Sequence, residues 1–492
     1  MTMLKVFWTK LSFLSRLRLF FGAFLCLMIL VFLYLKVVPF GHITYTKTWP
    51  AGLRSGKGFI YDFKPAERLA TGTAALRVIA DPVYFSLFTP RRFDQVQVTV
   101  KYRERLGTTT PIIELGVLQD KIAGSYELRP LQNDIVDALR FSWPRLDDSA
   151  ERLVLQQERE YSSLADFDAD LAAGHLRGCP SGPAACVAVY DYSLPEEYRV
   201  PDYVRLSPLT IDQPLRGSHQ FYVYFPSGPW RLKFSFTDLN QDRAADPVTV
   251  NVYRDGQLAA TQAFADANPD PTGGQTETKD LTLTGQAASG GVYKVEVRIS
   301  DDVVIARLES SSEKLAFINK IWPVSGAGVL TLFTDAAYLQ ATAFDPANLG
   351  SISFGGQAFA LDTPYRQFTW QAGPGVKEIK LAKDDIVLSN SGVFAFSRAG
   401  LFNPAPARID RFFAPGGDTR YVMAAYERPL LEAGRKTARA SFNISGADRD
   451  KGKYTFLISV PGLDGTAPEN YLDIEEIQVE LSGRTLWQKI WD

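Results

Sequence analysis

The chain has 492 residues and a net charge of −2, with 53 Lys and Arg against 55 Asp and Glu. A single hydrophobic core rarely grows past about 250 to 300 residues, so this length predicts several domains. The two signs of charge are balanced and no long basic block occurs, so the composition lacks the charge signature of a nucleic-acid-binding protein. We therefore expect no nucleic-acid partner.

A long apolar run stands near the N-terminus, LFFGAFLCLMILVFLYL, from Leu19 to Leu35. With the Lys36 amine reaching toward the headgroups, the apolar character continues to Phe40, close to the ~20 residues that span a bilayer. We predict a transmembrane anchor over residues 19–40. A cleaved signal peptide is the alternative, but its apolar region usually has about 7 to 15 residues and ends in small residues, whereas VVPFGHITY follows here.

The charges that flank this run predict its orientation. Four basic residues precede it and one closely follows it: Lys5, Lys10, Arg16 and Arg18, and then Lys36. Because positive flanks stay in the cytoplasm, residues 1–18 are expected to form a cytoplasmic tail. Everything after about residue 41 is then expected outside the cytoplasm, at the cell envelope.

The rest of the chain has the alternating pattern of half-buried β-strands. Apolar residues recur at every second position in VQVTVKY (residues 96–102), VTVNVY (248–253), YKVEVRI (293–299) and IEEIQVEL (474–481). Clusters of Gly, Pro, Asn and Asp separate such stretches, and strands of this length usually pair antiparallel. The predicted fold is mainly β: an N-terminal transmembrane helix followed by two to four antiparallel β-sandwich domains of jelly-roll or Ig-like type, with a short helical insertion.

The helical insertion is predicted within residues 146–205, where the alternation stops. Ser163 and Asp166 approximate a capping box, Phe167 and Leu171 share one helical face, and Gly174 can end the helix.

A disulfide is predicted directly after this helix. Cys179 and Cys186 bracket the Pro/Gly-containing stretch PSGPAA, which bends readily enough to close a small loop. In the chain-entropy model such a loop stabilises the fold by about 2.5 kcal/mol. Two free thiols are one alternative. A zinc site with His175 as third ligand is another, but no fourth ligand stands nearby.

These patterns predict a consecutive domain order. It is a first β domain over 41–145, the helical and Cys-loop segment over 146–205, a second β-sandwich over 206–320, and a third β-rich region over 321–492 with one or two sandwiches.

The stretch DLNQDRAADP, residues 238–247, places oxygen-bearing side chains at alternate positions, as calcium loops do. An EF-hand needs Gly at its sixth and Glu at its twelfth position, where this chain has Arg243 and Thr249. Alternating strands rather than helices flank the stretch, so an EF-hand is excluded.

The strand that follows leads to a second Asp-rich loop. Residues 248–254 meet Asp255-Gly256, a favoured hairpin dipeptide, so residues 257–264 can return antiparallel. The loop ADANPDPTGG then starts on a neighbouring strand roughly 5 Å away. Seven candidate ligands share this rim: Asp238, Asn240, Asp242, Asp246, Asp266, Asn268 and Asp270. A calcium ion would relieve their repulsion, and solvated Asx turns are the alternative.

Motifs for catalysis are missing from the sequence. It lacks HExxH, a phosphate loop, a Rossmann fingerprint and a GxSxG elbow, so we predict no catalytic residue and leave enzymatic activity open. Glycosidases need only two carboxylates, but the adjacent Glu475 and Glu476 are expected on opposite faces of a strand. Three tryptophans, Trp230, Trp322 and Trp370, are candidates for sugar stacking or, more commonly, for core packing.

Two stretches carry a resemblance: ADPVYFSLFTPRRFDQVQVTVKYR (residues 80–103) and GSHQFYVYFPSGPWRLKFSFTDLNQDRAADPVTVNVYRDG (217–256). Here the chain resembles uncharacterised single-pass membrane-anchored surface proteins of candidate-phyla (Patescibacteria-like) bacteria. The resemblance spans most of the extracytoplasmic part and implies an envelope location and β domains, but no activity.

The expected function is therefore binding or scaffolding at the cell envelope. A glycan-binding or adhesive module array is one alternative, and a membrane-tethered carbohydrate-active enzyme is another. The expected partners are the membrane itself and an envelope protein or glycan.

Overall fold

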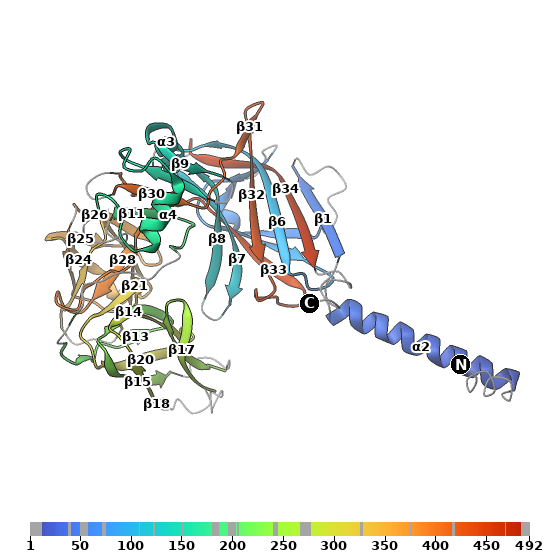
Figure 1. Ribbon diagram of the computed structural model, residues 1–492, viewed down its shortest axis with the longest axis horizontal. Helices are drawn as coiled ribbons and strands as arrows, with labels where there is room; N and C mark the ends of the chain where they lie inside the picture. Colours follow the sequence, from blue (N-terminus) through green and yellow to red (C-terminus); the bar gives the residue numbers. More distant parts are fainter. Residues whose placement is uncertain are drawn as a thin grey trace. The chain divides into compact units, whose positions relative to one another are not determined.

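The computed structural model describes residues 12–37, 41–49, 58–70, 75–107, 109–121, 124–149, 152–179, 186–194, 203, 206–239, 245–265, 277–324, 328–373, 375–415, 419–467 and 469–483. As predicted, the fold is mainly β, in several largely antiparallel sheets, with one long apolar helix near the N-terminus (Figure 1). The chain forms two compact units, residues 1–133 with 427–492 and residues 134–426.

The N-terminal helix α2 (Phe13–Val37) has 25 residues. Within its segment Phe13–Tyr34, an 18-residue stretch has a mean hydropathy of 2.4, and none of that stretch is buried against the rest of the protein. The predicted helix, long and apolar enough to cross a membrane, is therefore confirmed, although it begins at Phe13 rather than at residue 19. A membrane anchor and a signal sequence both have this length and apolar character.

The first unit consists of two sheets. One contains β1 (Gly41–Thr48), β3 (Leu69–Ala70), β4 (Leu76–Val78), β6 (Gln95–Arg105), β31 (Leu430–Glu432), β32 (Arg435–Asn443) and β34 (Tyr471–Gly483). The other contains β2 (Ile60–Lys64), β5 (Val83–Phe88), β7 (Ile112–Asp120), β8 (Ser125–Asn133) and β33 (Lys453–Ser459), and the 3-10 turn η1 (Ala66–Arg68) precedes β3. The strand orders are β3-β4-β34-β6-β32-β31, with β1 beside β34, and β2-β5-β33-β7-β8.

One core joins these two sheets. Alternate residues of β6, such as Val98 and Val100, are buried in the same cluster as Phe85 of β5 and Phe456 of β33. The strand β6 lies between β34 and β32, so strands from the C-terminal end complete a unit that begins with β1 (Figure 1).

The second unit begins with a small mixed sheet and two helices. Its elements are α3 (Asp134–Ser142), β9 (Arg145–Asp148), β10 (Leu153–Gln156), α4 (Leu164–Ala172), β11 (Val187–Tyr190), β29 (Ala407–Arg408) and β30 (Tyr421–Ala424). The order is β29-β11-β30-β10-β9, and β11 runs parallel to both of its neighbours. The predicted segment 146–205 therefore contains short strands as well as the predicted helix.

The helix α4 has the predicted ends and the predicted buried face. The Ser163 hydroxyl caps it by accepting a hydrogen bond from the Asp166 N–H at 3.1 Å. Phe167 and Leu171 are buried, and Gly174 follows with a φ of +71°, a conformation that glycine adopts easily.

Two further sheets form the body of the second unit. The smaller contains β12 (Leu209–Ile211), β13 (Leu215–Arg216), β15 (Gly228–Asp238), β18 (Glu277–Ala287) and β20 (Val303–Ser310). The larger contains β14 (His219–Phe225), β16 (Val248–Arg254), β17 (Gln257–Phe264), β19 (Gly291–Arg298), β21 (Leu315–Ile321), β22 (Leu330–Thr334), β23 (Tyr338–Ala343), β24 (Gly350–Phe354), β25 (Gln357–Leu361), β26 (Phe368–Gln371), β27 (Lys377–Leu381) and β28 (Ile386–Ala395), and η2 (Pro346–Asn348) precedes β24.

The larger sheet crosses the boundary expected at residue 320. Its order is β17-β16-β19-β14-β21-β28-β22-β27-β24-β25. The pairing of β21 with β28 therefore joins the predicted second domain to the predicted third region in one sheet. The compact units thus do not follow the consecutive ranges 41–145, 206–320 and 321–492. Periodicity identifies strands, but it carries no information on which strands pair.

The predicted hairpin is confirmed. Its arms β16 and β17 pair antiparallel, with Val248 opposite Phe264. Both turn residues, Asp255 and Gly256, have positive φ (54° and 71°), which matches the right-handed twist of the strands. The loop before Val248 and the chain after Phe264 therefore start at the same end of the sheet.

Candidate functional site

Three aspartates converge at the end of this strand arrangement. Asp238 ends β15, Asp246 stands two residues before β16, and Asp302 directly precedes β20. Each offers a carboxylate oxygen within 4.8 Å of the others. Asp246 and Asp302 are buried, at 5% and 8% exposure, so their mutual repulsion is poorly screened by water.

A small cavity adjoins this aspartate triad. Its volume is ≈ 10 Å³, about that of one water-sized probe. It is lined by Phe236, Asp238, Asp246, Val248, Phe264, Lys279 and Val303. The charge of the triad can thus be balanced by a cation or by the Lys279 ammonium.

The structure brings together two of the seven predicted ligands and adds a new one. Asp238 and Asp246 meet as predicted, and Asp302 joins them. The other five, Asn240, Asp242, Asp266, Asn268 and Asp270, lie outside the described residues. A signal for Asp302 exists in the sequence, because SDD (residues 300–302) separates two alternating stretches; its proximity depends on β15 pairing with β20, which places Asp238 opposite Val303.

A cleft lies on the other face of the same strand pair. Along β15, Thr237 alternates with Asp238, and Thr237 is paired with Val304 of β20. Both Thr237 and Val304 line the cleft, whereas Asp238 and Val303 line the small cavity. The two features are therefore separated by a single layer of backbone.

The cleft combines apolar walls with charged groups. Its volume is ≈ 440 Å³, within the range of small-molecule sites. It is lined by Pro214, Arg216, Thr237, Leu239, Val304, Ala306, Val324, Asp345, Asp384 and Asp385. Three carboxylates face one guanidinium, so the lining favours neutral or cationic ligands over anionic ones.

Hydrogen bonds hold the charged groups of the cleft in place. The Trp322 indole N–H donates to Asp385 at 2.9 Å, and the Arg216 guanidinium lies 4.0 Å from the same carboxylate. Asp345 accepts a hydrogen bond from the Ala347 N–H at 2.8 Å. Each carboxylate can still accept hydrogen bonds from a ligand, because an ionised carboxylate has about four lone-pair positions.

Aromatic rings continue from this region to the surface. The Trp322 ring lies 5.3 Å from that of Phe344, which lies 5.9 Å from that of Tyr365. Phe344 is 36% exposed and Tyr365 70% exposed.

The three candidate tryptophans mainly pack against other side chains of the protein. Trp230 and Trp322 are buried, and Trp370 is half-buried between Phe359 and Phe368, with ring distances of 5.1 and 5.9 Å. The core-packing alternative therefore holds for Trp230 and Trp322.

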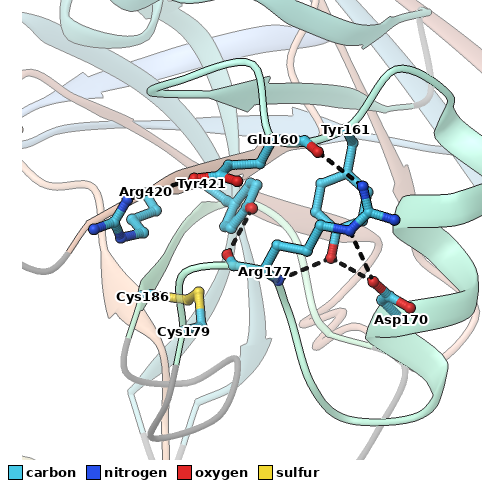
Figure 2. The surroundings of a disulfide bond; sticks show 8 residues. All are labelled: Glu160, Tyr161, Asp170, Arg177, Cys179, Cys186, Arg420 and Tyr421. Carbon is cyan, nitrogen blue, oxygen red and sulfur yellow. Dashed lines mark hydrogen bonds and ion pairs between the residues drawn. A yellow bond between two sulfur atoms is a disulfide. The ribbon is translucent and has the colours of Figure 1, made fainter.

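The predicted disulfide is present between Cys179 and Cys186 (Figure 2). Both cysteines are buried in one cluster with Phe167 of α4 and Val187 of β11, so the bond fastens the turn after the helix to the sheet. Joined sulfurs cannot serve as thiolate ligands, which removes the zinc alternative. The His175 ring instead lies 3.5 Å from the Asp170 carboxylate.

The polar groups near the disulfide form hydrogen bonds and ion pairs with one another (Figure 2). The Arg177 N–H donates to the Tyr161 hydroxyl at 2.9 Å, which donates to Asp170 at 2.8 Å. The Tyr421 hydroxyl donates to the Arg177 carbonyl at 2.8 Å. Burial raises the pKa of both phenols, so they stay neutral donors and the network is structural.

His219 is the one buried histidine, and it is also structural. Its Nδ1 lies 2.7 Å from the Gly217 carbonyl, and its Nε2 lies 3.2 Å from the Trp322 N–H. A carbonyl only accepts and an amide only donates, so the neutral ring with its proton on Nδ1 satisfies both partners. Burial, with a further contribution from the Lys320 charge, lowers the pKa of His219 to about 3.

The predicted orientation of Glu475 and Glu476 is wrong. A β-bulge in β34 inserts Glu475 between Ile474 and Glu476, so both side chains lie outside the core. Glu475 pairs with Arg103 and Arg435 at 3.0 and 2.9 Å, and Glu476 pairs with Lys101 at 2.7 Å. Both carboxylates are therefore engaged in surface ion pairs.

Comparison with known proteins does not extend these observations. No protein-family model and no curated protein matches the chain. Matches among solved structures include Sulfolobus Turreted Icosahedral Virus (9% identity, 73% of this chain and 98% of that chain, TM-score 0.17). Others are the VP2 subviral particle of infectious bursal disease virus (10%, 92% and 84%, 0.15) and dimeric latent PorU from Porphyromonas gingivalis (10%, 74% and 33%, 0.16). At these TM-scores the matches carry no argument about function.

The buried histidine predicts acid sensitivity. Because the folded pKa of His219 is about 3 and the unfolded value about 6.5, its contribution is fully present above pH ~6.5 and is lost as the pH falls toward 3. We expect the free energy of unfolding to fall by about 1.4 kcal/mol per pH unit in this window from this group. Chemical denaturation from pH 7 to pH 4 measures the slope.

Two variants test whether His219 causes this pH dependence of the free energy of unfolding. His219→Asn is expected to be less stable at pH 7 but to lose this part of the pH dependence. The exposed His175→Asn is expected to keep it. An unchanged slope in His219→Asn would show that other groups cause the acid sensitivity.

Proposed function

We propose that this protein is anchored in a membrane by one helix and that its β units lie outside the cytoplasm, where they bind or scaffold a partner at the cell envelope. The jelly-roll or Ig-like type of the sheets belongs to the same proposal. The resemblance to single-pass surface proteins of candidate-phyla bacteria agrees with it.

The observation that carries the proposal is the exposure of α2. Apolar side chains cover this helix on every side, among them Phe20, Leu25 and Leu30 at 62%, 61% and 63% exposure. A helix that is hydrophobic all round belongs in a core or a bilayer, and no part of this one is buried in the protein. At about 1.5 Å per residue its 25 residues measure roughly 37 Å, enough for the ~30 Å hydrocarbon layer.

The disulfide supports a location of the β units outside the cytoplasm. Cys179 and Cys186 are joined, and structural disulfides persist mainly in oxidising compartments outside the cytoplasm. The excess of basic residues before the helix supports the same orientation.

Protease added to intact cells that express the full chain tests the anchor. We expect the β units to be digested and an N-terminal tag to be spared. Complete protection would contradict the orientation. Recovery of intact β units that lack the tag and are free of the membrane would establish a cleaved signal peptide instead.

We also propose that the aspartate triad binds calcium, with the five other predicted oxygen ligands belonging to the same proposal. Three carboxylates within 4.8 Å of one another, two of them buried, support it. Calcium takes about 6 to 8 oxygen ligands in flexible loops, and sites of modest affinity suffice at extracellular concentrations.

The melting transition of the full chain in detergent tests the calcium site. Calcium at ten times its Kd is expected to stabilise the fold by about 1.4 kcal/mol, and a chelator to reverse this. Asp302→Asn is expected to abolish the response and, by relieving repulsion, to stabilise the calcium-free protein. The neighbouring Asp301→Asn serves as control.

The opposite pattern would favour Lys279 as the partner of the triad. In that case neither calcium nor chelator moves the transition, and Asp302→Asn destabilises the protein because it removes a carboxylate from a balanced cluster.

Glycan binding is the second candidate function, and the cleft is the observation that favours it. Carboxylates accept hydrogen bonds from pairs of sugar hydroxyls, and the Arg216 guanidinium donates them. The apolar side chains of Leu239, Val304 and Val324 offer a wall for the C–H face of a sugar ring. The surplus of carboxylates predicts neutral or amino sugars rather than uronic acids.

A glycan array probed with the full chain tests the cleft. We expect binding of neutral or amino-sugar glycans that Asp384→Asn weakens at least about tenfold, as the loss of a charge-assisted hydrogen bond implies. The exposed Asp362→Asn, outside the cleft, is the matched control. Release of sugar by the unmodified chain but not by Asp384→Asn would identify a carbohydrate-active enzyme, and no binding at all would contradict this candidate.

A further inference from the structure

One end of the first unit is tied closely to the anchor by the course of the chain. The strand β1 begins at Gly41, which is paired with Gly483 at the end of β34. The preceding residue of β34, Ser482, is paired with Gln95, the first residue of β6, and Gln95 is paired with Asn443, the last residue of β32. The loops before β6 and after β32 therefore lie at the same end as Gly41.

The facing sheet brings its own strand ends to this place. The loop before β6 begins where β5 ends, at Phe88, and Phe88 is paired with Lys453, where β33 begins. Thr89 and Gly452 are joined by a backbone hydrogen bond of 2.8 Å. We call the surface formed by residues 41–42, 58–59, 88–94, 120–121 and 444–453 the proximal end.

The tether to the anchor is short. Helix α2 ends at Val37, and four residue steps to Gly41 span about 14 Å at most. Since a headgroup layer is about 5 to 7 Å thick, Gly41 must lie within roughly 10 Å of the membrane surface if α2 is the proposed anchor. This distance is close to the Debye length of about 8 to 10 Å, so charges at the proximal end feel the surface potential.

The exposed charge of the proximal end is positive. Arg92, Lys451 and Lys453 are exposed, and they have no carboxylate partner among the described residues. The remaining exposed charges there, on Lys121 and Asp450, lie 3.9 Å apart and cancel each other. Three half-exposed acidic residues of this end, Asp94, Asp120 and Asp448, outnumber the half-exposed Arg91 and Arg449 by one, so the proximal end as a whole keeps a net excess of two positive charges.

Cations elsewhere in the same unit behave differently. On the outer face of the sheet, Lys101 is paired with Glu476, and Arg103 and Arg435 are paired with Glu475. These three cations are therefore balanced by carboxylates, unlike Arg92, Lys451 and Lys453 of the proximal end.

Aromatic side chains stand beside these cations. Phe59 and Phe88 are 45% and 37% exposed, with ring centroids 6.3 Å apart, and the Tyr45 ring stacks on Phe59 at 4.2 Å. The Lys453 amine lies 5.7 Å from the Tyr61 ring. Exposed aromatic rings together with Arg and Lys are the composition found at membrane interfaces.

We propose that the proximal end docks on the anionic lipid headgroups of the leaflet from which the anchor emerges. The proposal rests on the anchor proposed above. Each unit of net positive charge near an anionic surface contributes a similar increment, so the net excess of two is expected to change the docked-to-free ratio on the order of 30-fold. Docking restrains the first unit at the membrane, whereas the anchor alone would leave it free to pivot.

Hydrogen exchange of the full chain in lipid nanodiscs tests this proposal. We compare discs that contain phosphatidylglycerol with discs of phosphatidylcholine alone. Amides of residues 88–94 and 444–453 are expected to exchange at least tenfold more slowly in the anionic discs, and 0.5 M salt is expected to remove the difference. Equal exchange in the two kinds of disc would overturn the proposal.

Two triple variants carry the same charge change. Arg92→Gln/Lys451→Asn/Lys453→Gln is expected to abolish the protection; Asn suits position 451 because its φ is +48°. Arg103→Gln/Arg105→Gln/Arg435→Gln, at the far end of β6 and β32, is expected to retain it. Unchanged exchange of the buried β6 amides checks that both variants fold.

Failure of docking is distinguishable from failure of the anchor. Co-elution of the chain with the discs reports insertion independently of exchange. A chain that co-elutes but shows no lipid dependence contradicts docking alone, whereas a chain that does not enter the discs contradicts the anchor and docking together.

Discussion

The pairing of β6 with β34 on one side and β32 on the other is the interaction on which the first unit depends. These three strands come from opposite ends of the chain, and their buried faces, including Val98, Val479 and Ala440, meet in one core. Both hydrogen-bonded neighbours of β6 therefore come from the C-terminal part of the chain. β34 also pairs with β1, so the same strand determines which end of the unit lies next to the proposed anchor.

A second strand pair organises the other unit. Along β15 and β20, residues alternate between the two faces, so Asp238 belongs to the aspartate triad while Thr237 lines the cleft. The proposed calcium site and the proposed glycan site therefore lie on opposite faces of one strand pair.

Most strongly polar groups inside the described parts of the molecule serve the fold. His219 uses both ring nitrogens to hold Gly217 and Trp322, and backbone groups of Arg177 hold the hydroxyls of Tyr161 and Tyr421 near the disulfide. Glu475 and Glu476 are held in ion pairs by a bulge. Among the described residues, the cleft, the triad and the proximal end are the features on which the proposed binding functions rest.

The sequence by itself determined the features that depend on local pattern. The apolar helix, the capped helix at Ser163, the Asp255-Gly256 hairpin and the Cys179–Cys186 loop follow from periodicity, capping, turn preference and short separation. Only the tertiary structure decided which strands pair. It completed the first unit with C-terminal strands, added Asp302 to the triad, formed the cleft, and turned Glu475 outward through a bulge. The physical reason is that the alternation of apolar residues in a strand specifies its buried face but not its neighbouring strand. A site formed by residues of two paired strands therefore cannot be predicted from the alternation alone.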